Sequence, residues 1–132
     1  MALSGGGANG SWEAGVIYGL VNNGNLADFG WDVLTGVSAG SINAMYMAGT
    51  EIGSEIEMAQ GMSDLWGNLH SSDVWKDWKL GRVSGLTIMG GIVDNSPLLN
   101  FLQEMNAPQT EYKRKITITA ANVESGVYTE FD

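Results

Sequence analysis

The chain has 132 residues, of which 44% are hydrophobic, so it can build a folded core and is not expected to be disordered. Its 15 acidic and 6 basic side chains give a formal net charge of −9, which argues against nucleic acid and anionic membrane surfaces as partners. It has no cysteine, which excludes disulfides and thiolate metal sites.

Neither a secretory signal nor a membrane-spanning segment is predicted. No run approaches the ~18 apolar residues that a spanning helix needs, and Met1 to Leu3 lead directly into glycines without the basic and apolar regions of a signal peptide. A strand of a parallel sheet usually has about five residues. We therefore expect residues 1–132 to be a single partial domain, incomplete at both ends. Compartment and oligomeric state stay open.

The first half of the chain predicts two strand–loop–helix units. The predicted strands, loops and helices are, in chain order, residues 1–4, 5–7 and 9–21, then 31–35, 36–40 and a helix that ends at Ala48. In the first helix Trp12, Val16 and Leu20 recur at four-residue spacing on one face, and Gly24 supplies the stop. This repeated order is typical of a parallel α/β sheet.

The second half predicts a helix, an irregular stretch, a short helix and two strands. These are residues 51–69, 71–89, 96–105, 115–123 and 127–131. Ser96 is expected to cap the short helix, with Pro97 in its first turn. The basic cluster Lys113 to Lys115 is interpreted as a solvated entry to the following strand.

Ser38 lies at the centre of a G-x-S-x-G pattern, in which Gly36 and Gly40 flank it two positions away. A nucleophile on a tight strand-to-helix turn takes a strained backbone conformation, and the residues two positions either side must be very small. The pattern lies between an apolar strand and a helix, as this geometry requires, and predicts Ser38 as a nucleophile. The alternative is a plain glycine turn in which Ser38 caps the helix.

Three consecutive glycines follow the first predicted strand. Unobstructed backbone N–H groups at Gly5, Gly6 and Gly7 form a natural anion cradle. With the N–H of Ala39 at the next helix N-terminus, they are candidates for an oxyanion hole that stabilises the tetrahedral intermediate formed by Ser38.

The same loop also permits a different interpretation. Gly5, Gly7 and Gly10 satisfy G-x-G-x-x-G, the dinucleotide-binding fingerprint, and Asp28 or Asp32 would then be the ribose-binding acid. A merely structural turn is the third option. The serine elbow about 30 residues later favours the oxyanion hole, because an acyl hydrolase needs both parts together.

Taken together, these residues resemble the patatin-like phospholipases, a family of serine lipid acyl hydrolases. The family's glycine-rich loop and its G-x-S-x-G correspond to residues 5–10 and 36–40. Residues 91–98 are similar to the family's stretch before a helix, and residues 116–131 to its later pair of strands. The resemblance covers nearly the whole chain.

The resemblance implies a three-layer α/β/α sandwich with a mainly parallel sheet, here truncated. It implies hydrolysis of ester-linked acyl chains in phospholipids or neutral lipids by a Ser–Asp dyad, in which an Asp-Gly-Gly or Asp-Gly-Ala aspartate takes the serine proton. Lipid is then the partner, with peripheral membrane contact as an accompanying option. Calcium is not required, and we expect no metal or other cofactor.

The sequence departs from the family pattern in two respects. Asn9 stands where the family usually has Lys or Arg. No aspartate here precedes a glycine, and neither Asp94 nor Asp132 is assigned as the base. The dyad aspartate is expected outside these residues, so the polypeptide as written should be inactive, because an unactivated serine hydroxyl is a weak nucleophile.

Other residues have ordinary interpretations. His70, the single histidine, is a candidate base but lies at a polar helix end, where a structural role is expected. The tryptophans and four helical methionines are expected in the core, with a lipid-facing surface as the alternative for the tryptophans. These residues are Trp12, Trp31, Trp66, Trp75, Trp78, Met45, Met47, Met58 and Met62. A non-catalytic binding module or a degenerate hydrolase remains the alternative function.

Overall fold

The computed structural model describes residues 1–79, 81, 92–106 and 111–132. The chain forms two compact units, the first made of residues 1–68 and 109–132 and the second of residues 69–108. The first unit has the predicted α/β architecture. No helix among the described residues is long and apolar enough to cross a bilayer.

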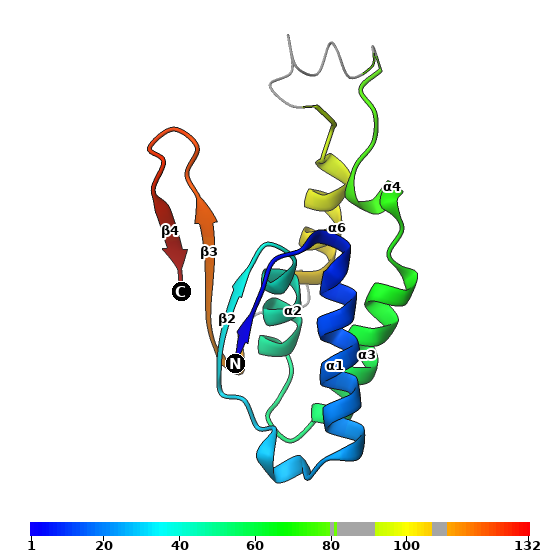
Figure 1. The fold of residues 1–132 in the computed structure, drawn as a ribbon, viewed down its shortest axis with the longest axis vertical. Helices are drawn as coiled ribbons and strands as arrows, with labels where there is room; N and C mark the ends of the chain where they lie inside the picture. The colour runs from blue at the N-terminus through cyan, green and yellow to red at the C-terminus, as the bar shows by residue number, and fades with distance from the viewer. Residues whose placement is uncertain (80, 82–91, 107–110) are drawn as a thin grey trace. The chain divides into compact units, whose positions relative to one another are not determined.

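The sheet of the first unit is mainly parallel (Figure 1). Its described strands are β1 (Ala2–Leu3), β2 (Val33–Val37), β3 (Lys115–Ala121) and β4 (Tyr128–Phe131), in that spatial order. β1, β2 and β3 run parallel, and β4 pairs antiparallel with β3. The predicted strand order along the chain is confirmed.

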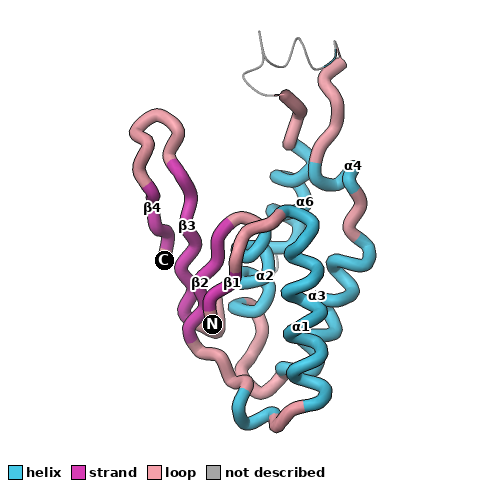
Figure 2. Tube along the Cα trace, in the orientation of Figure 1, coloured by secondary structure: helices cyan, strands magenta, loops and turns pink. Residues whose placement is uncertain are grey.

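Three helices of the first unit lie together on one side of this sheet (Figures 1 and 2). They are α1 (Gly10–Asn23), α2 (Ala39–Ala48) and α3 (Glu55–Asn68), and short 3₁₀ turns occur at Gly7–Asn9 and Leu26–Asp28. A strand order that advances in one direction, with right-handed crossovers, places both crossover helices on the same face. Of the three expected layers, the described residues of the first unit therefore form the sheet and one helical layer.

The burial of β2 shows the two faces of the sheet. Leu34 and Gly36 are buried toward the helices, whereas Val33, Thr35 and Val37 alternate with them and are exposed. The core lies between the sheet, α1, α2 and α3. Its buried members are Leu3, Ala14, Ile17, Val21, Leu34, Ala44, Met47, Ala48, Met58, Ala59 and Met62. Three of the four methionines expected there are thus fully inside.

The solvent-facing side of α1 is apolar, contrary to expectation. Trp12 is 72% exposed, and Val16 and Leu20 are exposed with it. The core-facing residues are Gly10, Ala14, Ile17 and Val21. Core packing was therefore the wrong interpretation for Trp12. The helix is apolar around most of its circumference, so periodicity alone could not identify the buried face.

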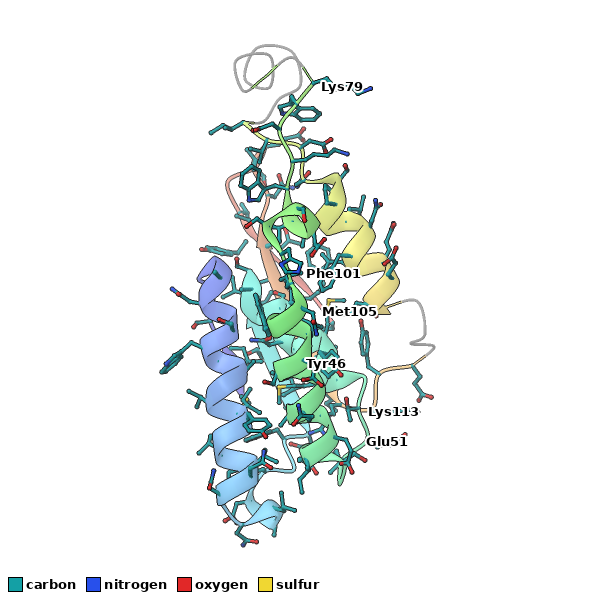
Figure 3. All side chains as sticks on the ribbon, turned by 90° about the vertical axis from the view of Figure 1, so that its right-hand side faces the viewer. Tyr46, Glu51, Lys79, Phe101, Met105 and Lys113 are labelled. Carbon is teal, nitrogen blue, oxygen red and sulfur yellow. The ribbon has the colours of Figure 1, made fainter. Side chains whose placement is uncertain are left out.

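Arg114 ties the start of β3 to the segment before α3. Its buried guanidinium donates to the carbonyls of Thr50, Trp31 and Glu51 at 3.1, 2.8 and 3.1 Å, and its Nη2 lies 3.1 Å from a carboxylate oxygen of Glu55. The predicted solvated cluster is thus wrong at its central residue, because four acceptors converge on Arg114. The flanking Lys113 is exposed and its Nζ lies 3.4 Å from Glu51 (Figure 3).

Several element boundaries differ from the sequence prediction, and two of the differences have a visible local cause. β2 begins at Val33 rather than at Trp31, whose ring instead stacks at a tilt on Phe29 with centroids 5.4 Å apart. α3 begins at Glu55, since Gly53 takes a positive φ of 105° and donates its N–H to the Glu55 carboxylate at 2.8 Å.

The second unit contains α4 (Ser71–Val74) and α6 (Ser96–Asn106). Lys76 and Asp94 form an antiparallel bridge through their backbones, and Lys76 Nζ lies 3.3 Å from the Asp94 carboxylate. The backbone N–H of Ser96 donates to Asp94 Oδ1 at 2.9 Å, so the Asp94 side chain closes the turn into α6.

The predictions for this unit are confirmed in part. The expected short helix begins at Ser96 and has Pro97 in its first turn. The stretch predicted to be irregular opens with the single turn of α4. Residues 80 and 82–91, which include part of that stretch and Gly91 of the segment before α6, lie outside the described residues.

Candidate active site

Ser38 occupies the turn between β2 and α2 and has a strained backbone. Its φ of 54° and ψ of −124° make it the one residue other than glycine with a positive φ in the described part of the chain. A serine in such a conformation costs on the order of 1–3 kcal/mol, which the surrounding structure must offset. Its side chain makes no capping hydrogen bond to α2, so the alternative in which Ser38 serves as an ordinary helix cap is not supported.

Steric crowding explains the glycines on either side of Ser38. A Cβ added to Gly36 would lie 2.5 Å from the carbonyl oxygen of Gly40. A Cβ added to Gly40 would lie 2.5 Å from the carbonyl carbon and oxygen of Leu3. The turn therefore packs directly against the end of β1, and only glycine fits at both positions.

This packing brings the glycine loop to Ser38. A Cβ built on Gly5 would lie 3.0 Å from Ser38 Cβ and 3.7 Å from Ser38 Oγ. Gly6 and Gly7 follow with φ values of 156° and 58°, conformations that side chains rarely adopt. The two motifs, more than 30 residues apart in sequence, thus share one edge of the sheet, at the carboxyl ends of β1 and β2.

Several backbone donors in this region have no acceptor. Among the described residues, no hydrogen bond uses the N–H groups of Gly5, Gly6, Gly7 or Ala39. Ala39 is the first residue of α2, where N–H groups have no partner within the helix. Free N–H groups near an exposed hydroxyl can stabilise an oxyanion as it develops during acyl transfer.

Gly10 closes the glycine loop and opens α1. A Cβ here would meet the ring of Trp66 and would lie 3.0 Å from Ala39 Cβ. Close packing therefore requires glycine at this motif position. Through Gly10, the loop packs against the first turn of α2 and against α3.

The acids that a dinucleotide site would need lie at the wrong edge of the sheet. Asp28 and Asp32 both precede β2, so they lie toward its amino end. The glycine loop follows the carboxyl end of β1, which runs parallel to β2. A ribose-binding acid belongs at the carboxyl end of the second strand, and there the chain has Ser38.

The remaining candidate bases have other local contacts, which His70 makes through its backbone and the two aspartates through their side chains. The backbone N–H of His70, in the second unit, donates to Asp73 at 2.8 Å at the start of α4. Asp94 is held by Ser96 and Lys76, as described above. Asp132 accepts a hydrogen bond of 2.6 Å from Thr117.

Three polar residues of this region were not predicted from the sequence. Glu13, Asn43 and Trp66 are joined by hydrogen bonds of 3.1 and 2.7 Å, and Asn43 is only 1% exposed. A signal was present in each helix. Glu13 is the single charged residue of α1, and Asn43 interrupts the apolar run of α2.

Comparison with known proteins identifies one matching family. The sequence model described as Patatin-like phospholipase matches residues 1–126. Searches of curated proteins and of solved structures gave no match.

Proposed function

The chain belongs to the patatin-like phospholipase family, whose activity is the hydrolysis of lipid esters, and we propose that Ser38 is its nucleophile. The proposed substrates are fatty-acyl esters of phospholipids or neutral lipids. The observation that carries the proposal is the strained, exposed serine whose hydroxyl lies beside the backbone of Gly5.

In the proposed reaction, Ser38 Oγ attacks the ester carbonyl carbon and its proton passes to a general base. The carbonyl oxygen gains the negative charge, which the free N–H groups of Gly5, Gly6, Gly7 and Ala39 stabilise. Collapse of the tetrahedral intermediate breaks the ester bond, and the departing alcohol takes the proton. Water then attacks the acyl-serine by the same route, releasing the fatty acid and restoring the hydroxyl.

The base of the proposed dyad is an aspartate outside these 132 residues. None of the aspartates before Asp132 precedes a glycine, as the family's dyad aspartate does. The 132-residue polypeptide by itself is therefore expected to be inactive. An Asp-Gly-Gly or Asp-Gly-Ala encoded after Asp132 would support the hydrolase, and an open reading frame without one would favour a non-catalytic or degenerate module.

Labelling with a fluorophosphonate probe tests the nucleophile. The polypeptide that carries the dyad aspartate should be labelled at Ser38 and should hydrolyse a p-nitrophenyl ester. Ser38→Ala should abolish both, because the attacking oxygen is gone. Ser41→Ala, three residues further along α2, is the matched control and should retain labelling. Hydrolysis that persists in Ser38→Ala would rule out the assignment.

We also propose peripheral contact with lipid through the solvent-facing side of α1. Trp12 follows Gly10 by two residues, and this side of the helix carries no charge because Glu13 turns inward. Tryptophan favours the membrane interface. Cosedimentation with zwitterionic vesicles should be weakened by Trp12→Ser, whereas anionic vesicles should bind less because of the net charge of −9. Equal cosedimentation of the variant would exclude this contact.

A further inference from the structure

A series of hydrogen bonds, buried at Asn43 and exposed at Ser4, runs from α3 through α2 and α1 to the start of the glycine loop. Trp66 Nε1 donates to Asn43 Oδ1 at 2.7 Å. Asn43 Nδ2 donates to Glu13 Oε2 and to the carbonyl of Gly10, both at 3.1 Å. Glu13 Oε1 accepts from the backbone N–H and the hydroxyl of Ser4 at 2.7 and 2.8 Å.

The polarity of this series permits only one orientation of the Asn43 amide. Its oxygen faces the N–H of Trp66, which can only donate, and its nitrogen faces two acceptors, on Gly10 and Glu13. A flipped amide would oppose donor to donor and acceptor to acceptor. No buried side-chain polar atom in the described part of the chain lacks a hydrogen-bond partner. The connections are therefore fully satisfied and directional, which apolar packing could not provide.

These hydrogen bonds reach both ends of the glycine loop, Ser4 through Glu13 and Gly10 directly from Asn43. Ser4 immediately precedes Gly5, and Gly10 terminates the loop. Asn43 lies on α2, the helix that begins directly after Ser38. Asn43 thus connects α2, the helix that follows Ser38, to Gly10 directly and to Ser4 through Glu13.

We propose that Asn43, acting through Glu13 and with its amide oriented by Trp66, is the positioning residue that holds the glycine loop in register with Ser38. This inference rests on the proposed function, since the register matters to chemistry only if these groups act together. Loss of the amide would let the loop shift against the hydroxyl. A misplacement of about 1 Å at a reacting centre can lower the rate about 100-fold.

The first test measures the loop itself and needs no activity. In the 132-residue chain, Asn43→Leu keeps the branched shape and the number of side-chain heavy atoms but removes the hydrogen bonds. We expect lower ¹⁵N order parameters at Gly5, Gly6 and Gly7 and faster exchange of the Ser4 amide proton. Met47→Ala, one turn further along α2 and fully buried, is the control for a general loss of stability. Unchanged loop dynamics in Asn43→Leu would overturn the proposal.

The second test measures ester hydrolysis in the polypeptide that carries the dyad aspartate. Asn43→Leu should lower kcat by about 10- to 100-fold while KM changes less than about threefold, because positioning acts on the transition state. Met47→Ala, compared at an equal fraction folded, should keep the wild-type kcat. Equal losses of kcat in the two variants would reduce Asn43 to a packing residue.

A double substitution that moves the negative charge from position 13 to position 43 separates the effect of polarity from that of side-chain shape. Asn43→Asp has nearly the same volume but places a carboxylate against Glu13, so hydrolysis should fall at least as far as in Asn43→Leu. Adding Glu13→Gln places an amide donor opposite the carboxylate of the Asn43→Asp variant. The double variant should therefore recover part of the lost ester hydrolysis. No recovery would contradict the proposed connection. If Ser38→Ala still hydrolyses the ester, the proposed function fails, and the loop dynamics alone decide the role of Asn43.

Discussion

Ser38 shows how a single residue can hold a conformation that its own side chain disfavours. The positive φ is stable only because the backbone of Gly40 lies against Leu3 and Ser4, and because Gly36 leaves room for Gly40. The same contacts orient the hydroxyl toward Gly5. At this scale, the function depends on the absence of Cβ atoms at defined places as much as on the nucleophile itself.

Substitution of Gly40 by alanine tests this crowding. The new Cβ would lie 2.5–2.6 Å from backbone atoms of Leu3 and Ser4, which cannot rotate away. We expect a loss of roughly 1–3 kcal/mol of stability in chemical denaturation, as in other overpacked sites, together with loss of probe labelling at Ser38. Gly15→Ala is the control, because the added Cβ would meet nothing within 4 Å. Replacing a glycine inside a helix should raise the free energy of unfolding by about 0.5–1 kcal/mol. Equal stability of the two variants would contradict the prediction.

The positions of the Ser38 elbow and of the glycine loop could be predicted because their spacing reflects a steric need that is local in sequence. The positions of Asn43 and Glu13 in the site could not. Their hydrogen bond joins residues 30 positions apart, and nothing in either helix alone identifies its partner. In the sequence, they are recognisable only as polar residues within largely apolar helices.

At the scale of elements, the order of helices and strands agrees with the sequence prediction, but the buried face of α1 does not. Trp12, Val16 and Leu20 form as regular a series as the buried residues do. The smaller residues Ala14 and Gly10 allow close approach of α2 and α3, and this requirement decides which side turns inward. Close approach depends on partner helices, so a pattern within one helix cannot reveal it.

The clamp formed by Arg114 should be among the main stabilising contacts between β3 and the helices. Arg114→Met leaves the carboxylate of Glu55 buried without its cation, and we expect a loss of about 3–5 kcal/mol in urea unfolding. Adding Glu55→Leu should restore much of that loss, since an apolar pair has no charge to desolvate. Lys113→Met, at the exposed neighbour, should change stability by less than about 1 kcal/mol. A mild Arg114→Met phenotype would contradict the clamp.

Asp94 gives the entry to α6 a pH dependence. The backbone N–H of Ser96, followed by its hydroxyl and then by Lys76, holds the pKa of the Asp94 carboxyl below its ordinary value. A depressed pKa contributes stability that is present above the unfolded value of about 3.9 and is lost as pH falls through the folded value.

Because the Ser96 N–H is the larger cause, Lys76→Gln should leave the pKa of Asp94 still below its ordinary value in an NMR titration of the carboxyl carbon. We expect the first turn of α6 to open as pH falls and Asp94 becomes protonated. In Asp94→Asn this pH dependence should be absent. A return of the Asp94 pKa to its ordinary value in Lys76→Gln would show that the lysine dominates instead.

At the scale of the whole chain, the strand order leaves one face of the sheet uncovered by the helices of the first unit. Val33 is 48% exposed and Val37 37% exposed on that face of β2. The sequence predicted the helices and the parallel sheet, yet could not show on which face each helix would lie. That follows from the spatial order of β1, β2 and β3, which is a long-range property.

The uncovered face should promote self-association where charge repulsion vanishes. The net charge of −9 at neutral pH falls to zero near the sequence pI of about 4.3. Light scattering should therefore peak near that pH, and Val33→Lys should reduce the peak by interrupting the apolar face. Scattering that is independent of pH, or unaffected by Val33→Lys, would contradict this expectation.

The contact between Gly40 and Leu3 also makes the serine turn depend on the first strand. That strand pairs with β2, where the N–H of Thr35 donates to the carbonyl of Met1 at 2.9 Å. We therefore expect a chain in which β1 is not docked to carry a serine without the strained backbone. Removal of the first three residues should then inactivate Ser38, although none of the removed residues contacts the ester.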